Sequence, residues 1–158
     1  IYLNKTCYNG LYRVNQKGEF NTPIGDYAKP NILQEEVILA CSTALQKAWI
    51  IFGDFEKHAP RKGDFVYCDP PYHPTNESSF ISYTKNGFTE KDQERLRDWL
   101  LSAAKKGVNV MVSNSKTDYI EKIYQDKHFK NYIVHAPRSV NCKPTKRNDV
   151  QEFLITSF

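Results

Sequence analysis

The sequence lacks the glycine-rich turn with which α/β enzymes usually hold a cofactor. Its seven glycines never fall into a G-x-G or G-x-x-G pattern, whereas a cofactor-binding α/β fold usually needs one after its first strand. The chain also begins at Ile1, and its only methionine is Met111. We therefore expect the C-terminal part of a longer protein.

Patterns typical of disulfide frameworks, metal sites and membrane spans are missing as well. Cys7, Cys41, Cys68 and Cys142 are far apart, with no Cys-x-x-Cys pair, and the four histidines show no metal-ligand spacing. We expect free thiols in a reducing, cytoplasmic compartment and no metal. No apolar run approaches the roughly 20 residues of a membrane span, and no signal-peptide pattern is present.

What the sequence does contain is ordinary for one folded domain. The 158 residues are 40% hydrophobic and 25% charged, which is enough for a real core. The formal net charge of +4 is compatible with a polyanionic partner. Many basic proteins have no such partner, so the charge alone decides nothing.

The most informative stretch is Asp69-Pro70-Pro71-Tyr72, which directly follows the apolar run 64–68. That run predicts a buried strand, and two consecutive prolines end it because neither donates a backbone N–H. The four residues are thus displayed at the carboxyl end of a strand, where open α/β sheets bind ligands. The alternative is a proline-rich turn with Asp69 as a turn former.

These four residues suit methyl transfer to an exocyclic amine on a planar base. Such a nitrogen is a poor nucleophile because its lone pair is delocalised into the ring. The Asp69 carboxylate and the Pro70 carbonyl could accept its two N–H bonds. They would thereby aim the lone pair at an electrophile. Tyr72 offers a face on which a flipped base can stack.

A hairpin is predicted near the start of the chain, where segments 11–14 and 19–22 flank the loop 15–18. Basic and aromatic side chains alternate around it. A hairpin can enter a major groove, and arginine is the usual reader of guanine edges, which makes Arg13 a candidate. The alternative is a solvated hairpin with tyrosines packed beneath it.

Further helices and strands follow along the chain. Asn31 is a candidate N-cap for a helix whose buried apolar stripe runs to Ala48, and residues 49–52 predict a short strand. Thr89 opens an amphipathic helix in which Asp92 completes a capping-box pattern.

That helix ends at Gly107, and residues 108–112 predict the next buried strand. A strand, a helix and a strand in succession imply a right-handed parallel crossover. Thr117 caps a short helix, and residues 132–135 and 150–155 predict a closing antiparallel pair.

Two polar loops complete the prediction. Residues 73–87 form a long loop of the kind that is usually functional or mobile. A basic loop joins the last two strands, and it is either a solvated tip or a phosphate contact. Its basic residues are Arg138, Lys143, Lys146 and Arg147.

A larger set of residues, taken with their order and spacing, carries a resemblance to a known family. They are Tyr8-Asn9-Gly10-Leu11, Arg13, Asn15, Gly18, Phe20-Asn21, Pro23, Gly25, Tyr27, Pro30, residues 63–72, Phe80, Tyr83, Phe88-Thr89, Gln93, Leu96, Ser113-Asn114, Arg138-Ser139, Arg147 and residues 152–155. Together they resemble the Dam-type adenine-N6 DNA methyltransferases, over nearly the whole chain.

The resemblance implies an α/β fold, the C-terminal half of an S-adenosylmethionine-dependent, Rossmann-like methyltransferase sheet with part of a hairpin and helical target-recognition insert. Residues 1–48 would belong to that DNA-binding region, and residues 49–158 to the catalytic domain. The family's first half, with the main cofactor-binding motif, would be absent. The implied cofactor is S-adenosylmethionine, and the implied partner is double-stranded DNA containing GATC.

The resemblance also implies roles for single residues. Asp69, Pro70, Pro71 and Tyr72 would be catalytic, and Asp69 would contact the methionine end of the cofactor. Leu11, Arg13, Pro23 and Tyr27 would read bases of GATC, and Tyr8 would enter the base stack. The remaining DNA contacts expected are Asn9, Arg138, Lys143, Lys146 and Arg147.

Two other functions stay open. One is a DNA-binding remnant without catalysis, which the missing cofactor turn favours and the intact Asp69–Tyr72 motif disfavours. The other is methylation of RNA or of a protein amide, where similar motifs occur, although Arg13 and Tyr27 favour duplex DNA. Restriction-modification, mismatch repair and phage defence would leave the same pattern.

Overall fold

The computed structural model describes residues 1–15, 17–75, 87–136 and 150–158. They form two compact units, residues 1–53 and residues 54–158. Each unit is described by itself below.

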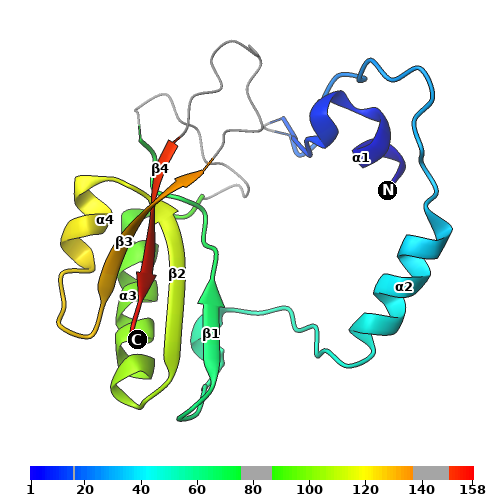
Figure 1. Ribbon diagram of the computed structural model, residues 1–158. Helices are drawn as coiled ribbons and strands as arrows, with labels where there is room; N and C mark the ends of the chain where they lie inside the picture. The colour runs from blue at the N-terminus through cyan, green and yellow to red at the C-terminus, as the bar shows by residue number, and fades with distance from the viewer. Residues whose placement is uncertain (16, 76–86, 137–149) are drawn as a thin grey trace. The chain divides into compact units, whose positions relative to one another are not determined.

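The second unit is built on a four-stranded sheet in the order β1-β2-β4-β3 (Figure 1). β1 and β2 are parallel, and β4 runs antiparallel to both β2 and β3. The parallel crossover and the closing antiparallel pair predicted from the sequence are therefore confirmed. The strands are β1 Phe65–Cys68, β2 Asn109–Ser115, β3 Lys130–Ala136 and β4 Val150–Thr156.

The helix between β1 and β2, α3 (Glu90–Lys105), begins where the capping box predicts. The Thr89 side chain accepts the backbone N–H of Asp92, and the Asp92 carboxylate accepts the backbone N–H of Thr89. Gly107 follows the helix with φ of +83°, a conformation that favours glycine. These local signals set both ends of the helix.

One hydrophobic core joins α3, the short helix α4 (Asp118–Ile123) and one face of the sheet. Val110, Val112 and Ile155 are fully buried in it, as is Leu100 of α3. Thr117 caps α4 by accepting the backbone N–H of Ile120. The core thus fixes the carboxyl end of β2 against both helices.

The strand predicted in the run 64–68 is confirmed as β1, but the prediction that it is buried is wrong. In β1, Val66 and Cys68 pack against the core, while Phe65 and Tyr67 are exposed on the opposite face. β1 is one of the two outer strands of the described sheet. An outer strand with one covered face buries only every second residue.

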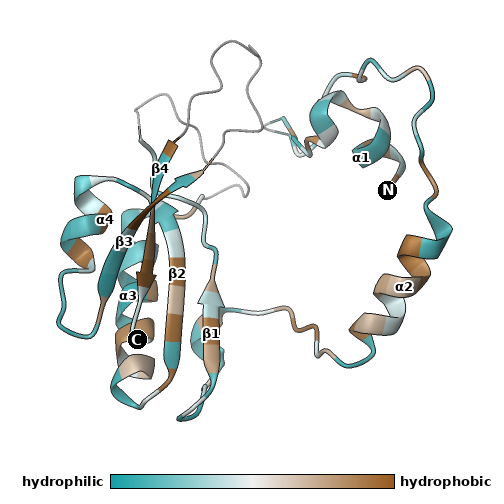
Figure 2. Cartoon of the chain, in the orientation of Figure 1, coloured by the Kyte–Doolittle hydropathy of each residue, from teal (hydrophilic) through white to brown (hydrophobic). Residues whose placement is uncertain are grey.

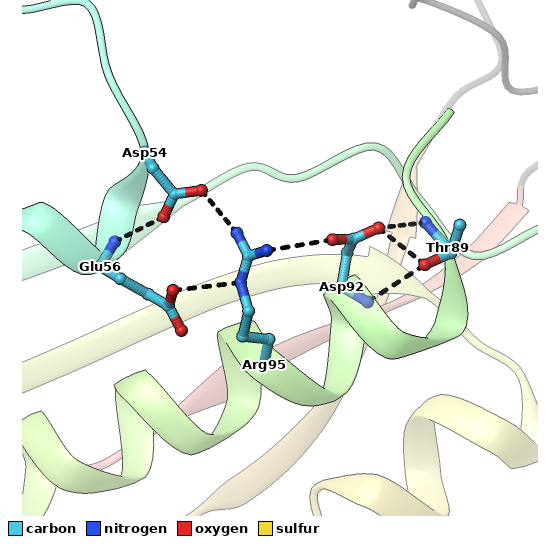
Figure 3. Close-up of polar contacts among 5 residues, drawn as sticks. All are labelled: Asp54, Glu56, Thr89, Asp92 and Arg95. Atoms are coloured by element: carbon cyan, nitrogen blue, oxygen red, sulfur yellow. Dashed lines mark hydrogen bonds and ion pairs between the residues drawn. The ribbon is translucent and has the colours of Figure 1, made fainter. Parts of the chain in front are cut away.

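A cluster of charges attaches the one-turn helix η2 (Phe55–Lys57) to α3 (Figure 3). Arg95 forms ion pairs with Asp54 at 2.6 Å, Glu56 at 3.3 Å and Asp92 at 3.4 Å. Its guanidinium also lies 4.9 Å from the centre of the Phe55 ring. Such partly exposed pairs are each worth only about 0–1 kcal/mol, so they position η2 more than they stabilise the fold.

The first unit contains the predicted hairpin. Val14 and Phe20 form an antiparallel bridge, and the Asn15 backbone N–H donates to the Glu19 carbonyl at 2.9 Å. Gly18 has φ of +81° in the turn. The hairpin follows α1 (Tyr2–Thr6) and the one-turn helix η1 (Tyr8–Gly10).

The helix predicted after Asn31 is present, but its predicted N-cap and its predicted burial are wrong. The helix expected from Asn31 is α2 (Glu35–Leu45), with Gln34 at the N-cap. Glu35 and Glu36 occupy its first turn, where the helix dipole favours carboxylates. None of its residues is buried, and Figure 2 shows apolar residues along the helix.

Residues 49–52 form no strand. A strand needs a neighbour for its backbone N–H and C=O groups, and these four residues take part in no β-bridge within residues 1–15 and 17–53. Their large side chains are exposed instead, Trp49 by 94%. Apolar composition alone therefore predicted the wrong structure.

Candidate active site

The Asp69–Tyr72 motif leaves the carboxyl end of β1 directly after Cys68. The parallel neighbour β2 places Ser113 and Asn114 beside it, near its own carboxyl end. The motif therefore lies where open α/β sheets bind ligands.

The Asp69 carboxylate is exposed, and one of its two oxygens accepts a hydrogen bond. The Ser113 hydroxyl donates to Asp69 Oδ1 at 3.0 Å, and the Tyr67 hydroxyl lies 3.1 Å from the same Ser113 oxygen. Because the single proton of Ser113 is used toward Asp69, the Tyr67 hydroxyl is the donor in its own bond with Ser113. The hydrogen bonds from Tyr67 to Ser113 and from Ser113 to Asp69 thus orient the Asp69 carboxylate, which can only accept, at an accessible position.

Tyr72 is half-buried, and its hydroxyl donates to Glu152 Oε2 at 3.3 Å. Burial raises the pKa of Tyr72, and the nearby charges of Glu152 and Asp69 raise it further. The net rise keeps the phenol neutral at physiological pH. Tyr72 is therefore available as an uncharged aromatic surface.

The residue after the motif, His73, is held on both sides. Its ring stacks on Tyr119 at 4.7 Å between centres. Its Nδ1 lies 3.1 Å from Thr117 Oγ1, and its Nε2 lies 3.4 Å from Glu90 Oε1. This cluster ties the end of the motif to the first turns of α3 and α4, and nothing in the sequence spacing pointed to it.

The six DNA-contact candidates among residues 1–27 lie in the first unit, and all are exposed. The backbone connects two of them, since the Tyr8 N–H donates to the Pro23 carbonyl at 2.8 Å. The six are Tyr8, Asn9, Leu11, Arg13, Pro23 and Tyr27.

An unusual backbone turn separates Tyr8 from Leu11. Asn9 has φ of +52° and Gly10 has φ of +64°, conformations that glycine adopts freely and asparagine tolerates. A Cβ atom at Gly10 would also lie 3.0 Å from the carbonyl oxygen of Asn4. The Asn-Gly pair therefore allows the chain to turn sharply between two exposed apolar side chains.

Arg13 projects from the hairpin and is oriented by Asn21. Its Nε donates to Asn21 Oδ1 at 2.9 Å, and its Nη2 donates to the Asn21 carbonyl at 3.0 Å. Arginine has five N–H donors in a planar fork, so the edge formed by Nη1 and Nη2 keeps donors to offer. Asn21 was not among the residues given a role from the sequence.

The remaining expected DNA contacts belong to the basic loop between the last two strands. Arg138, Lys143, Lys146 and Arg147 lie outside the described residues. Their role in DNA contact remains a prediction.

The comparison with known families decides which family this is. The model of the D12 class N6 adenine-specific DNA methyltransferases matches residues 1–140. The chain belongs to that family.

Individual relatives agree with this assignment. The chain is 45% identical to the type II methyltransferase M.MjaIII of Methanocaldococcus jannaschii, over all of this chain and 56% of that protein. It is 42% identical to the type II methyltransferase M1.LlaDCHI of Lactococcus lactis, over all of this chain and 57% of that protein. It is 36% identical to a DNA adenine methylase of Vibrio cholerae, over 98% of this chain and 56% of that protein. The chain thus spans little more than half the length of these relatives.

Within residues 1–15, 17–75, 87–136 and 150–158, no group of three or more His, Cys, Asp or Glu side chains could hold a metal ion. None of the helices in the described part of the chain has the length and apolar character to cross a membrane.

Proposed function

We propose that the protein containing this chain transfers a methyl group from S-adenosylmethionine to N6 of adenine in double-stranded DNA, within GATC. The exposed Asp69 carboxylate, oriented by Ser113 at the end of β1, carries the proposal. In the proposed division, residues 1–48 contribute to DNA recognition, and residues 49–158 form the second half of the catalytic domain.

The proposed chemistry follows from the groups of the motif. Asp69 and the Pro70 carbonyl accept the two N–H bonds of the target amine, and Tyr72 stacks on the flipped base. The nitrogen lone pair then forms the new N–C bond while the S–CH₃ bond breaks, and its electron pair stays on sulfur. One N6 proton leaves through the acceptors to water. Preorganised acceptors lower the barrier because they need no reorientation during the reaction.

The cofactor supplies the electrophilic methyl group in this scheme. Asp69 fits a contact with its cationic amino group, because the carboxylate is exposed and only Oδ1 is engaged by Ser113. A glycine-rich turn is not part of this sequence. We therefore propose Asp69 as this chain's own contact and place the main cofactor-binding motif outside it.

Tritium transfer from labelled cofactor into a GATC duplex tests the proposal. The protein expressed from its complete gene should label the duplex. The Asp69→Ala variant should lose activity by about 10²-fold or more, while its binding to the duplex largely survives. Variant activity within about tenfold of the wild type would remove Asp69 from this mechanism, and an inactive wild type would remove the proposed function.

A further inference from the structure

Two side-chain amides are buried directly behind the motif. Gln93 of α3 is 1% exposed, and Asn114 of β2 is 0% exposed. A buried amide destabilises the fold unless its nitrogen and oxygen are hydrogen-bonded. The contacts of these two side chains therefore show what they hold in place.

The two amides form a continuous series of hydrogen bonds that begins on the motif's backbone and ends on the backbone of the residue that follows it. Gln93 Nε2 donates to the Pro71 carbonyl at 2.8 Å, and Asn114 Nδ2 donates to Gln93 Oε1 at 3.1 Å. Asn114 Oδ1 then accepts the His73 backbone N–H at 2.9 Å. The same oxygen accepts the backbone N–H of Ser115 at 2.9 Å.

The direction of every bond is forced by the backbone at the two ends. The N–H groups of His73 and Ser115 can only donate, so Asn114 must turn its oxygen toward them and its nitrogen toward Gln93. Gln93 must then present its oxygen to Asn114 and its nitrogen to the Pro71 carbonyl, which can only accept. Reversing either amide would leave two donors or two acceptors facing each other.

The hydrogen bonds lie on both sides of Tyr72. They hold the carbonyl before it and the N–H after it, whereas the ring is tethered by one longer bond of 3.3 Å to Glu152. Pro70 and Pro71 have fixed φ angles, so a constraint on the Pro71 carbonyl is transmitted toward Asp69.

We propose that Gln93 and Asn114 are positioning residues for methyl transfer. They set the backbone on which Tyr72, the Pro70 carbonyl and Asp69 are presented to the target base. This inference rests on the proposed function, because it concerns the rate of that reaction. Gln93 lies on the same helix face as Leu96 and Leu100, where its spacing alone would suggest a core position.

Gln93→Met is the first test, in the protein expressed from its complete gene. Methionine has a similar length but neither donates nor accepts as an amide does. We expect the single-turnover rate on a GATC duplex to fall by about 10²-fold, as for a misplaced catalytic group, with duplex binding retained. Leu100→Ala is the matched control, because it empties a buried site on the same helix without touching the motif.

Asn114→Asp is the second test, and its readout is a pH profile. An ionised aspartate can accept from His73 and Ser115 but cannot donate to Gln93 Oε1, whereas the protonated acid can. The rate of the variant relative to the wild type should therefore fall as pH rises. His73 and Glu90 lie nearby in both proteins, and the ratio of the two rates removes any contribution from them.

The outcomes separate the two proposals. A wild type that transfers no methyl group overturns the proposed function. The positioning role is overturned if the wild type is active and the Gln93→Met variant reacts as fast as Leu100→Ala. The single-turnover rates of the two variants are compared at equal folded fraction. If Gln93→Met does not fold, Asn114→Asp decides, and a ratio independent of pH overturns the role.

Discussion

The Ser113 hydroxyl donates a hydrogen bond to Asp69 across 3.0 Å, although the two residues are 44 positions apart in the sequence. The bond connects β2 to the first residue of the motif. It fixes one oxygen of an exposed carboxylate, and the other side of the group stays accessible. A side chain outside the motif therefore controls the geometry of the motif's acid.

Removing the Ser113 hydroxyl should slow the proposed reaction. In Ser113→Ala, the Asp69 carboxylate loses its donor and samples other orientations. A hydrogen bond to a charged group is worth about 1.5–3 kcal/mol, so we expect the single-turnover rate to fall by at least about tenfold. Tyr67→Phe is the control, because it removes a hydroxyl from the same chain but leaves the Ser113–Asp69 bond. Equal rates for both variants would argue against this role.

Arg13→Ala should relax sequence discrimination at one base pair. The bonds to Asn21 leave the Nη1–Nη2 edge able to form two parallel bonds to guanine O6 and N7. Losing such a contact should cost about 1–3 kcal/mol. The measurement is the methylation rate of GATC and of duplexes in which one base pair of the site is replaced. We expect the variant to methylate one of the substituted sites at a higher rate, relative to GATC, than the wild type does.

The control for Arg13 is Lys17→Ala in the same hairpin. Lys17 is exposed. Its loss should weaken binding to every duplex by the same factor, as expected for a phosphate contact. If Arg13→Ala behaves in the same way and lowers the salt slope by about one unit, Arg13 anchors the backbone. The GATC assignment would then lose its main support.

Thr89→Ala should destabilise the second unit in a pH-dependent way. The loss of this N-cap should cost about 1 kcal/mol. Hydrogen bonds from the Thr89 side chain and backbone hold the pKa of Asp92 below its usual value. The resulting stability is present above the unfolded pKa of about 3.9 and is lost as pH falls through the lower folded pKa.

Urea unfolding at several pH values measures this effect. The difference between the wild type and Thr89→Ala should be largest near neutral pH and should narrow in acid. Thr43→Ala is the control, because that hydroxyl bonds the Leu39 carbonyl within α2 and caps no helix. A difference that is constant with pH would contradict the role given to Asp92.

The thiols should differ in reactivity toward iodoacetamide. Burial raises the pKa of Cys68 to about 11, so at pH 8 only about one thiol in 10³ is the reactive thiolate. Cys41 is exposed and free, whereas Cys7 is buried. Mass spectrometry of the peptides should find Cys41 modified first, and equal rates for Cys41 and Cys68 would be inconsistent with this environment.

The sequence by itself determined the features that depend on neighbouring residues. The capping box of Thr89 and Asp92, the end of α3 at Gly107 and the turn at Gly18 are set by hydrogen bonds and φ angles within a few residues. The motif at Asp69 is also local, because two prolines end a strand wherever they occur. Such features need no knowledge of the rest of the fold.

The tertiary structure decided everything that depends on a partner far along the chain. Residues 49–52 have the composition of a strand but form none in the described first unit, and β1 is half exposed because only one of its faces meets the core. Ser113 and Asn114 reach the motif because β2 lies beside β1, more than 40 residues away. Pairing and burial belong to two segments at once, so neither segment's sequence contains them.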